Sequence, residues 1–229
     1  MKKYKILLFD ADGTLFDFDR AGRYALEKCI VFFERDFQQE LHLKNYREIN
    51  NKIWRDFEKG LITAEELKIE RFRRFVERIK EDIEAESFAH KYLDFLGEAA
   101  FLIDGTEELL DKLSKMHRML ILTNGLAKVQ RKRLALSTIK EHFEGIVISE
   151  ELGIAKPDPQ IFQYSLDKMG YDRKEDVLMI GDSLSSDIRG GIEFGIDTCW
   201  YNPHGESAPE DYCPTYEIHN IRDLEEILL

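Results

Sequence analysis

The stretch "YKILLFDADGTL" at residues 4–15 decides the fold of this 229-residue chain. Residues 4–9 form an almost continuous apolar run, which is typical of a strand covered on both faces in a parallel sheet. The run ends at Asp10 and Asp12, where two neighbouring carboxylates repel each other. Gly13 follows and permits a turn. Since ligands bind at the carboxyl ends of parallel strands, this strand end is a candidate functional site.

Further apolar runs alternate with helical patterns along the chain. Four runs are candidate strands, the last two weaker than the others: 118–123, 176–181, 145–149 and 197–202. Four helical patterns lie between or beside them: 106–116, 126–137, 158–170 and 184–194. Strands and helices that alternate in this way predict an α/β fold with a Rossmann-like parallel sheet.

The region 16–98 lacks a clear strand pattern and predicts an inserted helical cap domain. Three segments in it have the period of amphipathic helices: 25–37, 46–60 and 64–83. Thr63 and Glu66 have the spacing of a capping box that opens the third helix. A compact insert is favoured because a structureless loop of this length is uncommon. We therefore expect a catalytic core formed by 1–15 and 99–229.

Composition and charge limit the classes of partner. Hydrophobic residues make up 43% of the chain, which is enough for a packed core, and the formal net charge is −12. This charge disfavours a nucleic-acid polymer or an anionic membrane as partner, but leaves room for a small anionic metabolite. A local basic cluster, "QRKR" at 130–133, is interpreted as a solvated helix face.

The cysteines and the N-terminus indicate a cellular compartment. Three cysteines lie far apart, at Cys29, Cys199 and Cys213, which favours a reducing environment over a disulfide framework. The apolar run at the N-terminus is too short for a signal peptide or a membrane span. We therefore expect a cytoplasmic protein.

Polar residues follow each of the three strongest candidate strands. They are Asp10, Asp12 and Thr14 after the first, Thr123, Asn124 and Gly125 after the second, and Asp182, Ser183 and Asp187 after the third. Lys156 lies between the second and third groups, in "AKPDP". Each group taken singly is also compatible with a turn or a helix cap. Together, and in this order, they predict one shared site.

The chemistry of these side chains points to a metal and a phosphoryl group. Two like charges about 4 Å apart cost about 4 kcal/mol at an effective dielectric constant of about 20, so clustered Asp10, Asp182 and Asp187 need a cation. Oxygen ligands favour Mg²⁺, with Mn²⁺ as the alternative. Lys156 adds positive charge, and Thr123 adds a hydroxyl. A phosphoryl group, with a charge of about −1.5 to −2, fits this combination.

These motifs resemble those of the haloacid dehalogenase-like (HAD) hydrolase superfamily, in the subgroup with a helical cap inserted after the first motif. The resemblance covers essentially the whole chain. A closer likeness, to the bacterial pyrimidine-type 5′-nucleotidases, rests on four segments: 49–67, 147–162, 198–202 and 214–228. It implies hydrolysis of phosphomonoesters, with (deoxy)nucleoside monophosphates as the expected substrates.

The resemblance also implies roles for individual residues. Asp10 is the nucleophile that becomes an aspartyl phosphate, and Asp12 is the general acid and then the general base. Thr123, Asn124 and Lys156 bind the phosphoryl group, Asn124 largely through its backbone.

For the metal, the resemblance implies that Mg²⁺ is held by the Asp10 carboxylate, the Asp12 carbonyl and Asp182. Asp187 supports the metal shell or Lys156. Gly13 permits the turn, Thr14 orients Asp12, and Ser183 is a further supporting residue.

Several alternatives remain open from the sequence. Phosphoglycolate or a sugar phosphate is the alternative substrate, and a phosphosugar mutase of the same fold also keeps both aspartates. Asp12 disfavours a haloacid dehalogenase, which lacks this second acid. Three aromatic residues are candidates to stack on a nucleobase or to form the core of the cap: Phe16, Phe18 and Trp54. His204 is interpreted as a surface residue.

Overall fold

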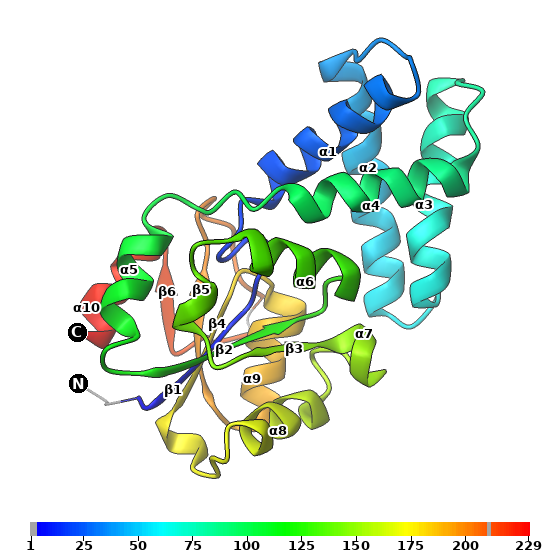
Figure 1. Ribbon diagram of the computed structural model, residues 1–229. Coiled ribbons are helices and arrows are strands. Elements are labelled where there is room, and N and C mark those ends of the chain that lie inside the picture. Colours follow the sequence, from blue (N-terminus) through cyan, green and yellow to red (C-terminus); the bar gives the residue numbers. More distant parts are fainter. Residues whose placement is uncertain (1–3, 210–211) are drawn as a thin grey trace. The chain divides into compact units, whose positions relative to one another are not determined.

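The computed structural model describes residues 4–209 and 212–229, excluding the side chains of residues 58 and 64. The chain forms two compact units (Figure 1). The sheet unit comprises Met1–Phe18 and Ala100–Leu229, and the helical unit comprises Asp19–Ala99. The division falls three residues later than the expected boundary at residues 15 and 16, because Phe16 belongs to the hydrophobic core of the sheet unit.

All six strands of the sheet are parallel, in the order β3-β2-β1-β4-β5-β6. Their bounds are Ile6–Phe9 (β1), Arg118–Thr123 (β2), Ile146–Ile148 (β3), Val177–Gly181 (β4), Asp197–Tyr201 (β5) and Tyr216–Ile218 (β6). The strand order reverses between β1 and β4, and such a switch point is where α/β sheets bind ligands. The predicted parallel α/β fold is confirmed.

The five candidate strands are all present, and β6 is the one that the sequence pattern missed. It has only three residues, and its middle residue, Glu217, is exposed. A run this short carries too little periodicity to be recognised. It extends the sheet beyond β5 without changing the position of the central strand ends.

Helices cover both faces of the sheet (Figure 1). The helices of the sheet unit are Thr106–Leu113 (α5), Ala127–Leu136 (α6), Ser149–Leu152 (α7), Pro159–Lys168 (α8), Arg189–Phe194 (α9) and Leu224–Leu228 (α10). Leu7 and Phe9 of β1 pack in one cluster with α5, α6 and α10, whereas Ile6 and Leu8 pack with α8 and α9. This alternation explains why β1 is apolar throughout.

Short helical turns complete the sheet unit, at Lys140–His142 (η1), Lys174–Asp176 (η2), Leu184–Ile188 (η3) and Ile221–Asp223 (η4). The single helix expected over 184–194 is in fact divided, since η3 is a π-helical turn and α9 continues from it. Single π turns of this kind occur frequently at functional sites. Here the turn carries Asp187.

The helical unit contains Gln39–Glu58 (α2), Ala64–Ile79 (α3) and Ala85–Glu98 (α4), together with Phe18–Phe32 (α1), whose first residue belongs to the sheet unit. The predicted capping box is confirmed: the Glu66 backbone N–H donates to Thr63 Oγ1, and the Thr63 N–H donates to Glu66. Buried aromatic rings from α2, α3 and α4 form its core, including Tyr46, Phe72 and Tyr92.

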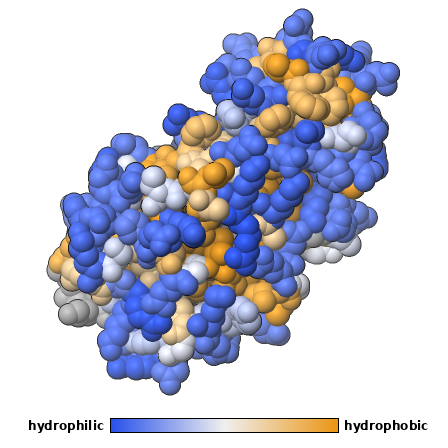
Figure 2. Space-filling view, in the orientation of Figure 1, coloured by the Kyte–Doolittle hydropathy of each residue, from blue (hydrophilic) through white to orange (hydrophobic). Residues whose placement is uncertain are grey.

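Hydrophilic residues dominate the face of the molecule seen in Figure 2, which also has smaller hydrophobic areas. Among the described residues, no helix is both long enough and apolar enough to cross a membrane.

Candidate active site

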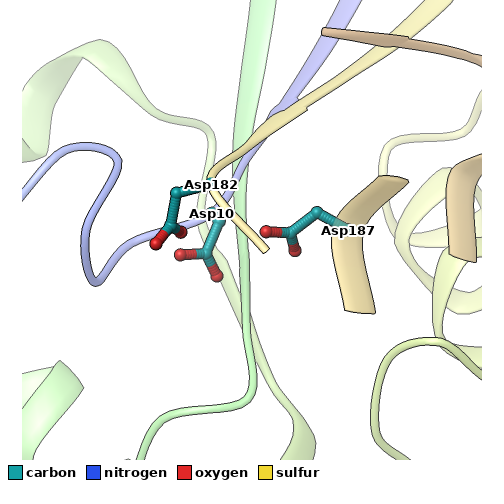
Figure 3. A group of neighbouring side chains, drawn as sticks. All are labelled: Asp10, Asp182 and Asp187. Carbon is teal, nitrogen blue, oxygen red and sulfur yellow. The ribbon is translucent and has the colours of Figure 1, made fainter. Parts of the chain in front are cut away.

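Three aspartates from separate segments meet at the carboxyl ends of the central strands (Figure 3). Asp10 follows β1, Asp182 follows β4, and Asp187 lies on η3. One carboxylate oxygen of each lies within 4.8 Å of those of the other two. Asp10 remains tied to the sheet because its backbone N–H donates to the carbonyl of Ile180. The sheet register therefore holds the carboxylates together.

The ammonium group of Lys156 lies among these acids. Its Nζ donates to Asp10 Oδ1 and to Asp187 Oδ1, at 2.6 Å each, and to the Leu122 carbonyl at 2.7 Å. The residue is only 2% exposed. All three donor positions of the ammonium are thereby used, so the lysine is rigidly oriented. A buried charge of this kind requires such partners.

Burial and mutual charge perturb the acid–base properties of the cluster. Burial alone would lower the pKa of Lys156, but Asp10 and Asp187 outweigh it and raise that pKa above its ordinary value. Burial raises the pKa of Asp10 well above its ordinary value, although Lys156 opposes this change. Burial, reinforced by the charge of Asp187, raises the pKa of Asp182 to about 7. Without a cation, therefore, the carboxylates resist ionisation.

Two glycines make room for the aspartates. Gly13 has φ of +85°, and a Cβ there would overlap Asp182 Oδ2. At Gly181 a Cβ would lie 2.6 Å from the Cβ of Asp187. Real Cβ atoms are not found this close to other heavy atoms, so the backbone at both positions approaches the acids only because no side chain is present.

The supporting residues bind Asp182 and Asp187 rather than Asp12. Thr14 was expected to orient Asp12, but its Oγ1 donates to Asp182 Oδ1 at 3.2 Å. The backbone N–H of Ser183 donates to Asp187 Oδ2 at 3.0 Å. Asp187 thus uses one oxygen for Ser183 and the other for Lys156.

Thr123 and Asn124 occupy the end of β2 in the same sheet unit. The Thr123 hydroxyl accepts from the Gly125 backbone N–H at 3.0 Å. The Asn124 side chain forms two reciprocal hydrogen bonds with the backbone of Lys156, accepting from its N–H at 2.9 Å and donating to its carbonyl at 2.8 Å. The Asn124 side chain therefore fixes the segment that carries the lysine.

Asp12 is held by two residues that the sequence interpretation missed. Gln130 Nε2 donates to Asp12 Oδ2 at 2.5 Å, and Arg133 Nη1 donates to Asp12 Oδ1. The prediction of a solvated face at 130–133 is wrong for these two residues, which are 1% and 0% exposed. Their spacing of three places them on one side of α6, next to buried Val129. That spacing was the one sequence signal that could have indicated a shared buried face for the two residues.

The aromatic candidates divide between the two units. Phe16 is 1% exposed and belongs to the sheet-unit core, so the expectation that it stacks on a base is withdrawn. Phe18 begins α1 and is half-buried. Trp54 lies on α2, also half-buried, with its ring edge-on to Phe57 at 5.8 Å. His204 is exposed, as expected.

The donor set at the strand ends fits a hard divalent cation. Asp10, Asp182 and Asp187 offer only carboxylate oxygens, which are the ligands that Mg²⁺ prefers. Asp187 already serves Lys156 and Ser183, which leaves Asp10 and Asp182 better suited as direct ligands. Their raised pKa values are the expected signature of acids that a cation would hold ionised.

Comparisons with known proteins show the family of this chain. A family model described as haloacid dehalogenase-like hydrolase matches residues 4–195. Pyrimidine 5′-nucleotidase YjjG of Escherichia coli is 34% identical, over 99% of this chain and 98% of its own length. Pyrimidine 5′-nucleotidase PynA of Streptococcus pneumoniae is 36% identical, over 96% and 93%.

A solved structure gives the same result for the fold. The HAD-hydrolase YfnB of Bacillus subtilis, crystallised with bound magnesium, superposes with a TM-score of 0.94. It is 35% identical, and the match covers 99% of each chain.

Proposed function

The chain belongs to the haloacid dehalogenase-like hydrolases, and from this premise we propose that it is a magnesium-dependent phosphomonoester hydrolase that acts through an aspartyl phosphate. The observation that carries the proposal is the buried Lys156 held between Asp10 and Asp187, beside Asp182. A cation bound to the acids and the lysine together would counter the charge of a phosphoryl group.

In the first half-reaction, a carboxylate oxygen of Asp10 attacks phosphorus, and the bond between phosphorus and the ester oxygen breaks. The leaving alcohol oxygen takes a proton from Asp12. The Thr123 hydroxyl and the backbone at Asn124 bind the phosphoryl oxygens, and Lys156, whose three donor positions are already used, attracts these oxygens through its charge. Covalent catalysis thus divides a difficult hydrolysis into two displacements.

In the second half-reaction, Asp12 takes a proton from water as the water oxygen attacks phosphorus. The bond between phosphorus and Asp10 breaks, which releases inorganic phosphate and restores the carboxylate. The proton that Asp12 takes from water replaces the one that it gave to the alcohol, so both half-reactions balance.

The Asp10 carboxylate, the Asp12 carbonyl and Asp182 would hold Mg²⁺. When bound, the ion would offset part of the negative charge of the acids and of the phosphoryl oxygens. Mn²⁺ has the same preference for oxygen ligands and is the alternative.

The substrate part of the proposal is a nucleoside 5′-monophosphate with a pyrimidine base. It is supported by YjjG and PynA, which are named for this activity and match almost the whole chain. We propose that the helical unit acts as the cap that selects the leaving group, with Phe18 and Trp54 as candidates to contact the base.

Steady-state hydrolysis of p-nitrophenyl phosphate tests the reaction class. We expect turnover that requires Mg²⁺ and is abolished in Asp10→Asn. The matched control is Asp158→Asn, the same chemical change at an exposed residue that caps α8 through Gln160. Asparagine caps equally well, so the control should be fully active. Absence of turnover in a folded wild-type protein that binds Mg²⁺ would contradict the proposal.

A panel of phosphorylated metabolites tests the substrate. We expect dUMP, dTMP and UMP to give higher kcat/KM values than phosphoglycolate or sugar phosphates. A reversed order would refute the nucleotidase assignment and leave the phosphatase intact. Conversion of one sugar phosphate isomer into another would identify a phosphosugar mutase.

A further inference from the structure

We propose that Arg133 and Gln130 are positioning residues for Asp12, which set the direction of its carboxyl group for both proton transfers. This inference rests on the proposed function, because it concerns the acid and base of that reaction. It assigns a role to two residues of α6 (Ala127–Leu136), which lie outside the strand-end motifs.

The two residues together bind both oxygens of one carboxyl group. Arg133 Nη1 donates to Asp12 Oδ1, and Gln130 Nε2 donates to Oδ2 at 2.5 Å. A single hydrogen bond would leave the group free to rotate about its terminal torsion, which is broad for aspartate. Two donors from a rigid helix on separate oxygens restrict that rotation.

The donors are themselves buried. Arg133 is fully buried and Gln130 is 1% exposed, whereas the Asp12 side chain is 24% exposed. The Arg133 guanidinium lies 5.3 Å from the centre of the Phe16 ring, which is part of the core. The exposed side of Asp12 is left for a substrate, while its buried side is anchored.

Burial of the arginine is costly unless it serves a partner. A guanidinium removed from water needs a counter-charge, and Asp12 supplies it across 121 positions of sequence. Arg131, on the same helix, shows the ordinary alternative, since it pairs with Glu151 at the exposed surface. The helix therefore directs one arginine outward and the other to the acid.

Gly125 permits the contact from Gln130. A Cβ at this position would overlap Gln130 Nε2, the atom that donates to Asp12. The conflict involves only the flexible side chain of Gln130 and is greatest at its amide nitrogen, so Gly125→Ala should displace that amide without distorting the backbone. The glycine after Asn124 thus gives a way to weaken the contact without changing Gln130, Arg133 or Asp12.

The orientation of Asp12 matters unequally for different leaving groups. An alkoxide needs the proton of Asp12 to leave, whereas p-nitrophenolate is stable enough to leave without it. Release of phosphate from Asp10 needs Asp12 as a base with either ester. A mispositioned Asp12 should therefore spare one event alone, the first release of p-nitrophenolate.

Rapid-mixing kinetics on the full chain with Mg²⁺ test this directly, with p-nitrophenyl phosphate and an alkyl phosphate as probes. In Arg133→Met and Gly125→Ala we expect a burst of one p-nitrophenolate per site, at nearly the wild-type rate. Later turnovers and alkyl phosphate cleavage should slow by about 10- to 100-fold, part of the 10²- to 10⁴-fold effect of general acid–base catalysis. Arg133→Lys should restore part of the loss.

The matched control is Arg131→Met, which removes an exposed ion pair from the same helix and should behave as wild type. If Arg133→Met does not fold, Gly125→Ala carries the test. The inference is overturned if the first release of p-nitrophenolate, the later turnovers and alkyl phosphate cleavage all slow equally, or if none of them slows in a folded variant. A wild-type protein that hydrolyses neither ester overturns the proposed function, and the inference with it.

Discussion

Lys156 Nζ donates a 2.6 Å hydrogen bond to Asp10 Oδ1 from a position 146 residues further along the chain. Both groups are buried, and the same ammonium also binds Asp187. One buried cation thus balances two carboxylates that would otherwise be uncompensated. The contact joins the ends of β1 and β2, because the lysine also binds the Leu122 carbonyl.

Replacement of this lysine should weaken both stability and activity. In Lys156→Met, Asp10 and Asp187 lose their cation, and breaking a buried ion pair typically costs about 3–5 kcal/mol. We expect urea denaturation in EDTA at pH 7 to show a loss of this size, which Mg²⁺ reduces because it replaces the missing charge.

The matched control is Lys168→Met, at an exposed position of α8. Its free energy of unfolding should change by less than about 0.5 kcal/mol. Equal unfolding free energies for the two variants would contradict the structural role of Lys156.

Metal and pH should act together on stability. The folded-state pKa of Asp182 is about 7, above its ordinary value of 3.8, so ionisation opposes folding. The stability that protonated Asp182 contributes is fully present below about pH 4 and is lost as the pH rises through 7. Asp10 acts in the same direction, because its pKa is also raised.

Because Mg²⁺ favours the ionised carboxylates, the difference in Tm between Mg²⁺ and EDTA should grow from pH 5 to pH 8. Thermal unfolding at four pH values measures it. Asp182→Asn removes both the titration and a ligand, so its difference in Tm should be small and flat. A wild-type difference that is the same at pH 5 and pH 8 would refute this prediction.

Loss of the Asn124 side chain should reduce activity through Lys156. Asn124→Ala removes the two hydrogen bonds to the Lys156 backbone, which contribute about 0.5–1.5 kcal/mol each. We expect kcat/KM for p-nitrophenyl phosphate to fall by about 10-fold, since about 1.4 kcal/mol corresponds to that factor. Asn124→Asp keeps the acceptor for the Lys156 N–H and loses the donor.

The aspartate variant should therefore retain more activity than the alanine variant when the added charge is screened by salt. An Asn124→Ala enzyme with wild-type kcat/KM would show that the segment around Lys156 is held by other contacts.

A methyl group at Gly181 should displace Asp187. The new Cβ would lie 2.6 Å from Asp187 Cβ, an atom close to the backbone that cannot easily move. We expect Gly181→Ala to lower the free energy of unfolding by about 1–3 kcal/mol, as overpacking does, and to lower activity with it. Urea denaturation and phosphatase assays measure the two effects.

Gly145→Ala is the control, because a Cβ there meets Lys168 and Leu120 at ordinary contact distances of 3.4 and 3.7 Å. It should change neither stability nor activity by as much. If Gly181→Ala matched this control, the close approach to Asp187 would carry no energetic weight.

The site could be predicted where its residues follow recognisable strands. Asp10, Thr123 and Asp182 come directly after or at the end of apolar runs, and parallel strands bring their carboxyl ends to one edge. Lys156 was predicted from its motif, although no strand precedes it directly. Thr14 was placed in the right region with the wrong partner, because its side-chain direction depends on how the turn at Gly13 closes.

The residues that the sequence did not reveal depend on packing between distant segments. From the sequence, Arg133 and Gln130 were interpreted as part of a basic surface cluster. The charge of a residue follows from its type, whereas its burial depends on segments that are distant in the sequence. Phe16 read as a cap residue, although it packs into the core of the sheet unit.

The amino-acid sequence by itself determined the parallel α/β core, the helical insert and the set of acids and lysine at the strand ends, because these follow from periodicity and from residue type at a strand terminus. Only the tertiary structure decided which donors face which acid: Lys156 between Asp10 and Asp187, Thr14 on Asp182, and Arg133 with Gln130 on Asp12. The physical reason is that a partner is chosen by direction and burial, which arise only when helices pack on the sheet.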